Sequence, residues 1–196
     1  MRVLICFIIY VMASLAIASG LPEWDVQVED VTGRKLGPQQ IRSHVTALSF
    51  STRGTRTESE KLGQYLGQRF GARHGYQSVA LINTSTMPFW MKPFAGGGIE
   101  SAYTEAVDEA IELQKNSGNS KATKERVQAR MYFVHDKTGD LWKRFGAEPE
   151  GDAFYFGILD SKGRMVYLAR NPKDFADIGR IMDRELTRLE TTVSRK

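Results

Sequence analysis

The sequence predicts an α/β fold with a mixed central β-sheet, helices on both of its faces and a β-hairpin at its N-terminal end. Short runs rich in β-branched and aromatic residues alternate with longer segments in which apolar residues recur at helical spacing. The strand–helix–strand order over residues 45–83 indicates a parallel β-α-β crossover. Residues 25–36 hold an alternating segment followed by a tight turn, which predicts the hairpin.

Residues 1–20 have the features of a secretory signal peptide. A basic residue precedes an apolar run over residues 3–17, and small residues follow it. We expect cleavage after Ala18 or Gly20, which leaves one domain over residues 21–196 in the periplasm or outside the cell. The alternative is an uncleaved N-terminal membrane anchor, because the apolar run approaches the shortest length that spans a bilayer.

The composition excludes several classes of function. Cys6 is the only cysteine, so the exported chain forms no disulfide, has no catalytic thiol and cannot hold a metal through cysteine. Without the signal peptide the chain has 26 basic and 23 acidic residues, spread along its length. Nucleic-acid-binding domains concentrate their basic residues on one surface, so we expect no nucleic-acid partner. We also expect no cofactor and no metal.

The central strand, its loop and its helix are the most strongly signalled elements. Residues 45–50 are apolar and rich in β-formers, as a buried strand is. A polar loop follows over residues 51–56, and Thr57 with Glu60 forms a predicted capping box. Apolar residues then recur at helical spacing as far as Phe70. Several α/β folds place their chemistry at such a helix start, because free N–H groups and the helix dipole converge there.

The middle of the chain continues with a predicted strand at residues 78–83. Residues 87–98 contain two prolines and three glycines, which predict irregular structure, and five large apolar side chains that are costly to leave in water. An amphipathic helix is predicted over residues 99–114 and a mobile polar loop over residues 116–125.

The last third holds a predicted core strand at residues 130–134 and a short helix at residues 139–145. Residues 154–169 read as a hairpin closed by an Asp-Ser-Lys-Gly turn. We expect the last helix to start at Asn171-Pro172, with the proline in its first turn and an apolar stripe extending to Leu189.

This order of elements, together with two local motifs, resembles the exported redoxin type of thioredoxin fold. The segment from Pro22 to Leu36 is similar to the redoxin opening, which runs Pro-x-aromatic (here Trp24) and then Asp-x-x-Gly-Lys. Residues 154–164 are similar to its apolar strand followed by Asp-x-x-Gly-Arg. The chain is also similar to the YtfJ-type periplasmic proteins, which lack the cysteine pair. The resemblance implies a thioredoxin-like domain over residues 21–196.

The chain departs from that family at both halves of the redox site. The family places Cys-x-x-Cys between the central strand and its helix, where residues 51–57 of this chain hold no cysteine. It places a cis-proline just before the penultimate strand, where this chain has residues 151–154 and Pro149 comes too early. Serine and threonine hydroxyls offer no thiolate, and no base is adjacent to them in the sequence. We therefore expect no redox activity.

The loop over residues 51–57 is one candidate binding site. Arg53, Thr55 and Arg56 flank a helix start whose dipole favours negative charge, so we predict that they bind an anionic ligand. The alternative is a capped helix start with two solvated arginines, because the loop lacks the glycine pattern of a phosphate cradle.

The aromatic segment is the second candidate. Aromatic and methionine side chains are enriched in interface cores and at adaptable binding surfaces. The predicted partner-binding residues are Met87, Phe89, Trp90, Met91 and Phe94. The alternative is a loop tucked over the edge of the sheet.

A metal site and a catalytic triad were also considered, and the sequence disfavours both. A Cu(I) site has no diagnostic spacing, although soft ligands for it are present in Met87, Met91, Met131 and His135. A hydrolase triad of Ser51, His135 and Asp136 lacks a nucleophile elbow, and adjacent residues of a strand point to opposite faces.

We therefore predict an exported protein without redox activity that binds an envelope or secreted protein, as an accessory, assembly or chaperone-like factor. A second class of function remains open: the protein is a small-anion binder, or a redoxin-related enzyme that works without cysteine, and uses the 51–57 loop as its site. A copper carrier is the third.

Overall fold

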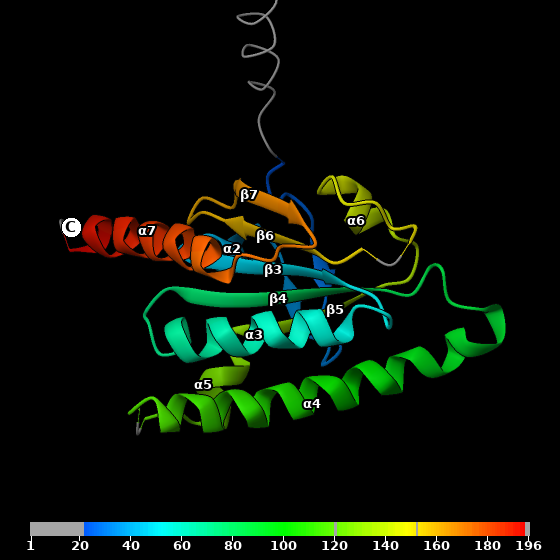
Figure 1. Ribbon diagram of the computed structural model, residues 1–196, viewed down its shortest axis with the longest axis horizontal. Coiled ribbons are helices and arrows are strands. Elements are labelled where there is room, and N and C mark those ends of the chain that lie inside the picture. Colours follow the sequence, from blue (N-terminus) through cyan, green and yellow to red (C-terminus); the bar gives the residue numbers. More distant parts are fainter. Residues whose placement is uncertain (1–21, 120, 152, 195–196) are drawn as a thin grey trace, which may run out of the picture.

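The computed structural model describes residues 22–119, 121–151 and 153–194, and the predicted signal peptide lies outside them. These residues form a five-stranded mixed sheet with helices on both faces, preceded by a two-stranded hairpin, so the predicted fold class is confirmed (Figure 1). The strands are β1 (Val28–Glu29), β2 (Lys35–Leu36), β3 (Val45–Ser51), β4 (Tyr76–Asn83), β5 (Met131–Asp136), β6 (Tyr155–Leu159) and β7 (Met165–Arg170).

The helices differ widely in length. The short ones are α2 (Pro38–Ile41), η2 (Phe89–Met91), α5 (Lys124–Gln128) and α6 (Asp140–Arg144). The long ones are α3 (Arg56–Phe70), α4 (Lys92–Asn116) and α7 (Phe175–Val193). In the part of the chain that the structure describes, no helix combines the length and the apolar character that crossing a membrane requires.

The main sheet has the strand order β5-β4-β3-β6-β7. β3 pairs in parallel with β4, and β4 in parallel with β5. β6 is antiparallel to both of its neighbours, β3 and β7. The two parallel pairs are joined by helical crossovers, as a parallel pair requires. The predicted strands at residues 45–50, 78–83 and 130–134 are therefore confirmed, with ends within two residues of those observed.

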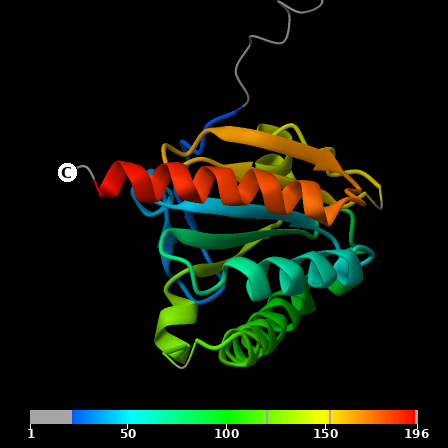
Figure 2. The same ribbon diagram turned by 60° about the vertical axis from the view of Figure 1, so that its left-hand side comes forward.

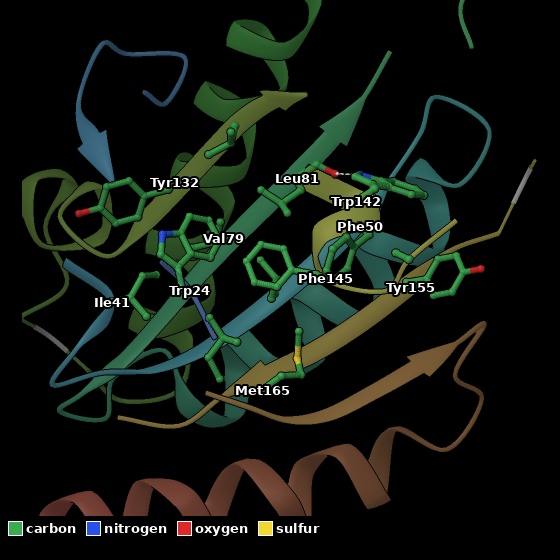
Figure 3. Packing of buried hydrophobic residues seen from close by; sticks show 14 of the residues in the cluster. Trp24, Ile41, Phe50, Val79, Leu81, Tyr132, Trp142, Phe145, Tyr155 and Met165 are labelled. Atoms are coloured by element: carbon green, nitrogen blue, oxygen red, sulfur yellow. Dashed lines mark hydrogen bonds between the residues drawn. The ribbon is translucent and has the colours of Figure 1, made fainter. Parts of the chain in front are cut away.

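One face of the sheet is filled by large side chains and is covered by the hairpin, α2 and α6 (Figure 3). The indole of Trp142 on α6 is fully buried, meets Phe50 edge-on at 5.8 Å between ring centroids, and donates its Nε1–H to the carbonyl of Leu81 at 3.1 Å. Trp24 stacks on Phe145 at 5.2 Å. These aromatic contacts fix α6 and the N-terminal segment against the sheet.

The opposite face is covered by three long helices. α3 and α7 lie side by side over β3 and β6 and bury their apolar stripes there (Figure 2). α4 follows on the far side of α3, where Tyr103 and Val107 pack beside Val127 of α5 and against Phe133 of β5. The sheet is thus the middle layer of three.

Three predicted element boundaries are wrong. α3 starts at Arg56 and its N-cap is Thr55, not Thr57, and Glu60 pairs with Arg56 instead of closing a capping box. α7 starts after Asp174, whose side chain accepts the N–H of residue 177 at 3.0 Å, so Pro172 precedes the helix. The polar loop over residues 116–125 runs into α5, which already starts at Lys124.

The expected irregular structure over residues 87–98 is also largely absent. α4 starts at Lys92 and passes through the three consecutive glycines at 96–98. Pro93 lies in the first turn, where its missing N–H has no partner to lose. The amphipathic pattern downstream carries the helix through its weak first turns. The result is a helix of 25 residues whose N-terminal end, with η2, projects beside the carboxyl ends of the central strands (Figure 1).

Candidate functional site

A cavity of about 470 Å³ lies where the carboxyl ends of β3 and β4 meet η2 and the first turns of α4, and we call it the Trp90 cavity. It brings together the two segments that the sequence marks separately. Of the eight predicted binding residues, six line it: Arg53, Arg56, Met87, Trp90, Met91 and Phe94. In open α/β sheets, this end of the parallel strands is where ligands bind.

The aromatic residues at this cavity are exposed, so the aromatic segment is not tucked over the sheet edge. The exposed fractions are 88% for Phe89, 71% for Trp90 and 78% for Phe94. Met87 and Met91 are half-buried and form part of the cavity wall. Val193, at the end of α7, is the one other large apolar residue that is exposed among the described residues. The apolar surface of the protein is therefore concentrated at this tip.

The three predicted anion-binding residues have different environments. The guanidinium of Arg56 forms ion pairs with Glu60 at 2.5 Å and Glu105 at 3.0 Å. The hydrogen bonds that Arg56 donates to Glu60, and then to Glu105, raise the pKa of Arg56. Arg53 is exposed at the cavity rim. Thr55 is buried and its Oγ1 accepts the N–H of Thr52 at 2.9 Å, so this hydroxyl serves the loop and does not line the cavity.

The charges at the Trp90 cavity do not favour an anion. Arg53 and Arg56 share its wall with three carboxylates, Glu60, Glu105 and Glu109. Glu60 and Glu105 already neutralise Arg56, and Glu109 accepts a hydrogen bond from Gln64 at 2.7 Å. The lining thus has a small excess of negative charge around a mainly apolar interior.

The residues of the disfavoured hydrolase triad do not assemble. Ser51 and His135 are separated by Ile82, which lies between them in the registers of β3, β4 and β5. His135 Nε2 instead lies 2.7 Å from the hydroxyl of Thr84, and burial, followed by the charge of Lys137, lowers its pKa.

Asp136 faces the other side of the sheet, as the alternation of strand residues requires. Its carboxylate accepts the N–H groups of Gly139 at 2.9 Å and Trp142 at 3.2 Å, so it holds the start of α6. It cannot orient a base on the opposite face.

The four residues considered as Cu(I) ligands do not surround a common point. Met87 and Met91 line the Trp90 cavity, whereas Met131 lines a second cavity. Met131 and His135 are four residues apart on β5, which corresponds to about 13 Å along a strand. No ion can contact both, since metal–ligand bonds are about 2 Å long.

The second cavity has a volume of about 380 Å³ and lies between α3, α4, α5 and the sheet. We call it the Arg130 cavity. The sequence contains a signal for it that the prediction did not use. In the middle of the face toward these helices, β3 and β4 carry alanine and serine, where the opposite face carries leucine, valine and phenylalanine. Small residues at alternate positions of two paired strands leave a hollow above the sheet.

The comparisons with known proteins find structural relatives only. The sequence matches no family model, and no curated protein matches it in sequence. Among solved structures, the chain is similar to an exposed lipoprotein thioredoxin of Streptococcus pneumoniae, with 10% identity, a TM-score of 0.54 and coverage of 82% of this chain and 98% of that one.

Two further solved structures give the same result. A hypothetical protein of Sinorhizobium meliloti has 20% identity, a TM-score of 0.53 and coverage of 86% of this chain and 84% of that one. A candidate thioredoxin of Neisseria meningitidis has 13% identity, a TM-score of 0.52 and coverage of 85% and 90%. At these identities the likeness establishes the fold and nothing about the chemistry.

Proposed function

We propose, starting from the thioredoxin-like fold of this chain, that it is an exported protein without redox activity that binds another envelope or secreted protein. It would act as an accessory, assembly or chaperone-like factor. The observation that carries the proposal is the concentration of exposed aromatic residues at one tip of the protein: Trp90 and Phe94, which line the Trp90 cavity, and Phe89, which precedes Trp90 in η2.

The first support is chemical. Residues 21–196 contain no cysteine, and thiol–disulfide exchange requires a thiolate. Ser51 occupies the end of β3, directly before the loop that leads into α3, and no base lies within hydrogen-bonding reach of it among the described residues. A covalent mechanism at Ser51 therefore lacks the base that would activate its hydroxyl.

The second support is the surface itself. Exposed apolar residues clustered on a protein of this size mark an interaction site, whereas single ones need no explanation. Aromatic rings supply large contact areas with few rotatable bonds, and the thioethers of Met87 and Met91 adapt to different partners. A partner side chain that enters the cavity would be desolvated beside them, as hot-spot residues are.

Export is part of the proposal. The predicted signal peptide directs the chain out of the cytoplasm, and the fold also occurs in an exposed lipoprotein thioredoxin. The partner is therefore expected among envelope or secreted proteins.

The rival proposal, a small anionic ligand or substrate at the 51–57 loop, rests on Arg53. This side chain is exposed at the rim and has no ion pair with another described residue. Glu60 and Glu105 argue against this rival proposal, because they form ion pairs with Arg56 and their negative charges would repel an anion.

The experiment is a capture from envelope extract with immobilised residues 21–196, followed by an affinity measurement with the purified captured protein. The double variant Trp90→Ala/Phe94→Ala should weaken binding at least tenfold, because aromatic residues at the centre of an interface carry most of its energy. Val193→Ala is the matched control, since it removes an exposed apolar side chain far from the cavity along the chain.

Equal binding by wild type and the double variant would overturn the proposal. An anion-dependent rise in melting temperature that Arg53→Gln abolishes, without any captured partner, would establish the rival instead.

A further inference from the structure

The Arg130 cavity has an unusually small-residue floor. In the register of β3 and β4, Ala47 lies beside Ser78, and Ser49 lies beside Ala80. All four line the cavity. Their neighbours on the other face, among them Leu48 and Leu81, are fully buried in the aromatic core. The sheet is thus densely packed on the α6 side, whereas on the other side the part beneath α3 and α4 is hollow.

The walls of the cavity are two helices that present small residues to each other. α3 contributes Gly63 and Gly67, and α4 contributes Ala106 and Ala110. A methyl group placed on Gly63 would meet no atom within 4 Å, whereas one on Gly67 would lie 3.8 Å from Leu113. Gly63 is exposed, so the space is open to solvent beside it and narrows toward Gly67.

One end of this cavity is basic. Lys121, Arg126 and Arg130 line it together with the polar side chains of Gln114 and Asn119. None of the three cations forms an ion pair with a described residue. Arg126 donates to the carbonyl of Lys121 at 3.3 Å and Arg130 to the carbonyl of Arg73 at 3.1 Å, which leaves most of their N–H groups free.

The two carboxylates in the lining lie at the opposite end. Glu60 and Glu109 belong to both cavities, as do Ser59, Ala80, Ala106 and Phe133. The Arg130 cavity therefore adjoins the Trp90 cavity there, and we call the space that the two form between α3 and α4 the channel. Its charge changes from positive to slightly negative along its length.

We propose that the Arg130 cavity, the part of this channel at the α5 end, binds a long-chain fatty acid. Its carboxylate lies at Lys121, Arg126 and Arg130, where charge-assisted hydrogen bonds are available. Its alkyl chain lies along the alanine and glycine residues between the helices, where burial removes methylene groups from water. This site is separate from the proposed function, because it uses the cavity at the α5 end and not the exposed tip.

Two features favour a single alkyl chain over other occupants. A methyl group on Gly67 would be in van der Waals contact with Leu113, so the space between the helices is narrow there and suits one alkyl chain better than a ring system. An extended peptide carries an N–H and a carbonyl group at every residue, and the sheet floor between the two ends of the cavity offers only the hydroxyls of Ser49 and Ser78 to satisfy them.

The test is calorimetric titration of residues 21–196 with palmitate. Gly63→Leu places a side chain in the channel and should lower the affinity at least tenfold. The variant should fold well, because leucine has a higher helix propensity than glycine. Gly97→Leu is the matched control: it is the same change in a helix, with no atom within 4 Å of the new Cβ and at a position that lines neither cavity.

The basic end is tested separately with Lys121→Gln/Arg126→Gln, which should weaken palmitate binding at least fivefold and leave binding of the alcohol of the same chain length unchanged. Lys124→Gln, on the exposed side of α5, is the control.

Equal affinity of wild type and Gly63→Leu would overturn the proposal, as would tighter binding of a cationic amphiphile. Binding of lysophosphatidylglycerol but not of palmitate would also overturn it and would indicate a phospholipid as the source of the alkyl chain. Loss of palmitate binding in Trp90→Ala/Phe94→Ala would contradict the separation of the two sites.

Discussion

Asp30 and Asp160 occupy equivalent positions in two separate hairpin turns and accept the same set of hydrogen bonds. In each turn Oδ1 accepts the N–H groups two and four residues later, at 2.9 to 3.0 Å. In each, Oδ2 accepts the Nε–H of the arginine four residues later at 2.9 Å. The glycine before that arginine has a φ of +79° in one turn and +86° in the other. The Asp-x-x-Gly-Arg pattern is thus one turn structure used twice.

The two arginines of these turns differ in burial, and this difference gives the first prediction. Arg34 pairs with a fully buried carboxylate, lies 4.4 Å from the ring centroid of Tyr132 and donates to the carbonyl of Met131. Removing it leaves Asp30 charged and buried, so Arg34→Met should lower the free energy of unfolding by about 3 kcal/mol. Arg164→Met, at a side chain that is 56% exposed, should cost less than about 1 kcal/mol. Urea unfolding of both variants checks the contrast, and similar losses would contradict it.

The second prediction concerns pH. Burial by itself would raise the pKa of Asp160, but hydrogen bonds from the Arg164 side chain and from two backbone N–H groups outweigh it and hold the pKa below its usual range. A carboxyl group with a lowered folded-state pKa stabilises the protein above its unfolded pKa, near 4, and this contribution disappears as the pH falls through the folded value.

The variant Asp160→Asn should therefore lose about 1–2 kcal/mol at pH 7, since hydrogen bonds to a charged group are worth that much. Its deficit relative to wild type should shrink below about pH 4. Urea denaturation as a function of pH measures both values. A deficit that stays constant down to pH 2 would show that the charge of Asp160 is not what stabilises the turn.

The third prediction is at the turn between α3 and β4. Gly75 has a φ of +79°, and a methyl group there would overlap Cδ2 of Leu189 on α7. Gly75→Ala should cost the left-handed backbone penalty of about 1–2 kcal/mol and a further amount for moving Leu189. Gly118→Ala has a similar φ, +87°, but no atom within 4 Å, so it should show the backbone penalty alone. Thermal unfolding of the pair separates the two contributions; equal losses would mean that α7 adjusts freely.

The fourth prediction uses the contrast between the three tryptophans. Trp24 and Trp142 are buried, whereas Trp90 is 71% exposed. Iodide should quench the Trp90 emission selectively, and Trp90→Phe should leave fluorescence that iodide barely affects. The free energy of unfolding should change by less than about 0.5 kcal/mol, as for other surface substitutions. Strong quenching that persists in the variant would place one of the other indoles in contact with solvent.

Much of the fold follows from local patterns. The strands β3 to β7 are apolar runs with clear turn signals, and both hairpin turns contain Asp-x-x-Gly-Arg. The first turns of α4 could not be predicted this way, because proline and three glycines disfavour a helix locally and only the long amphipathic segment behind them carries it. The N-cap at Thr55 could not be predicted, because Thr57 and Glu60 match the capping-box pattern better and indicate a helix start two residues later.

The composition of the candidate site was visible in the sequence, but its assembly was not. Arg53 and Trp90 lie far apart along the chain, and only the projecting end of α4 brings them to one cavity. The carboxylate of Glu105, which pairs with Arg56 from the middle of α4, had no local signal at all. The Arg130 cavity depends on which face each strand residue takes, and the register between β3 and β4 decides that.

The unequal filling of the two sides of the sheet has a mechanical consequence. Rings and branched chains leave the α6 side almost incompressible, whereas the channel under α4 can shrink or widen. Hydrostatic pressure acts first on such internal volume, so α4 should move toward the strands while α6 stays in place. The part of the protein beneath α4 is therefore expected to lose volume before the cores under α6 and α7 do.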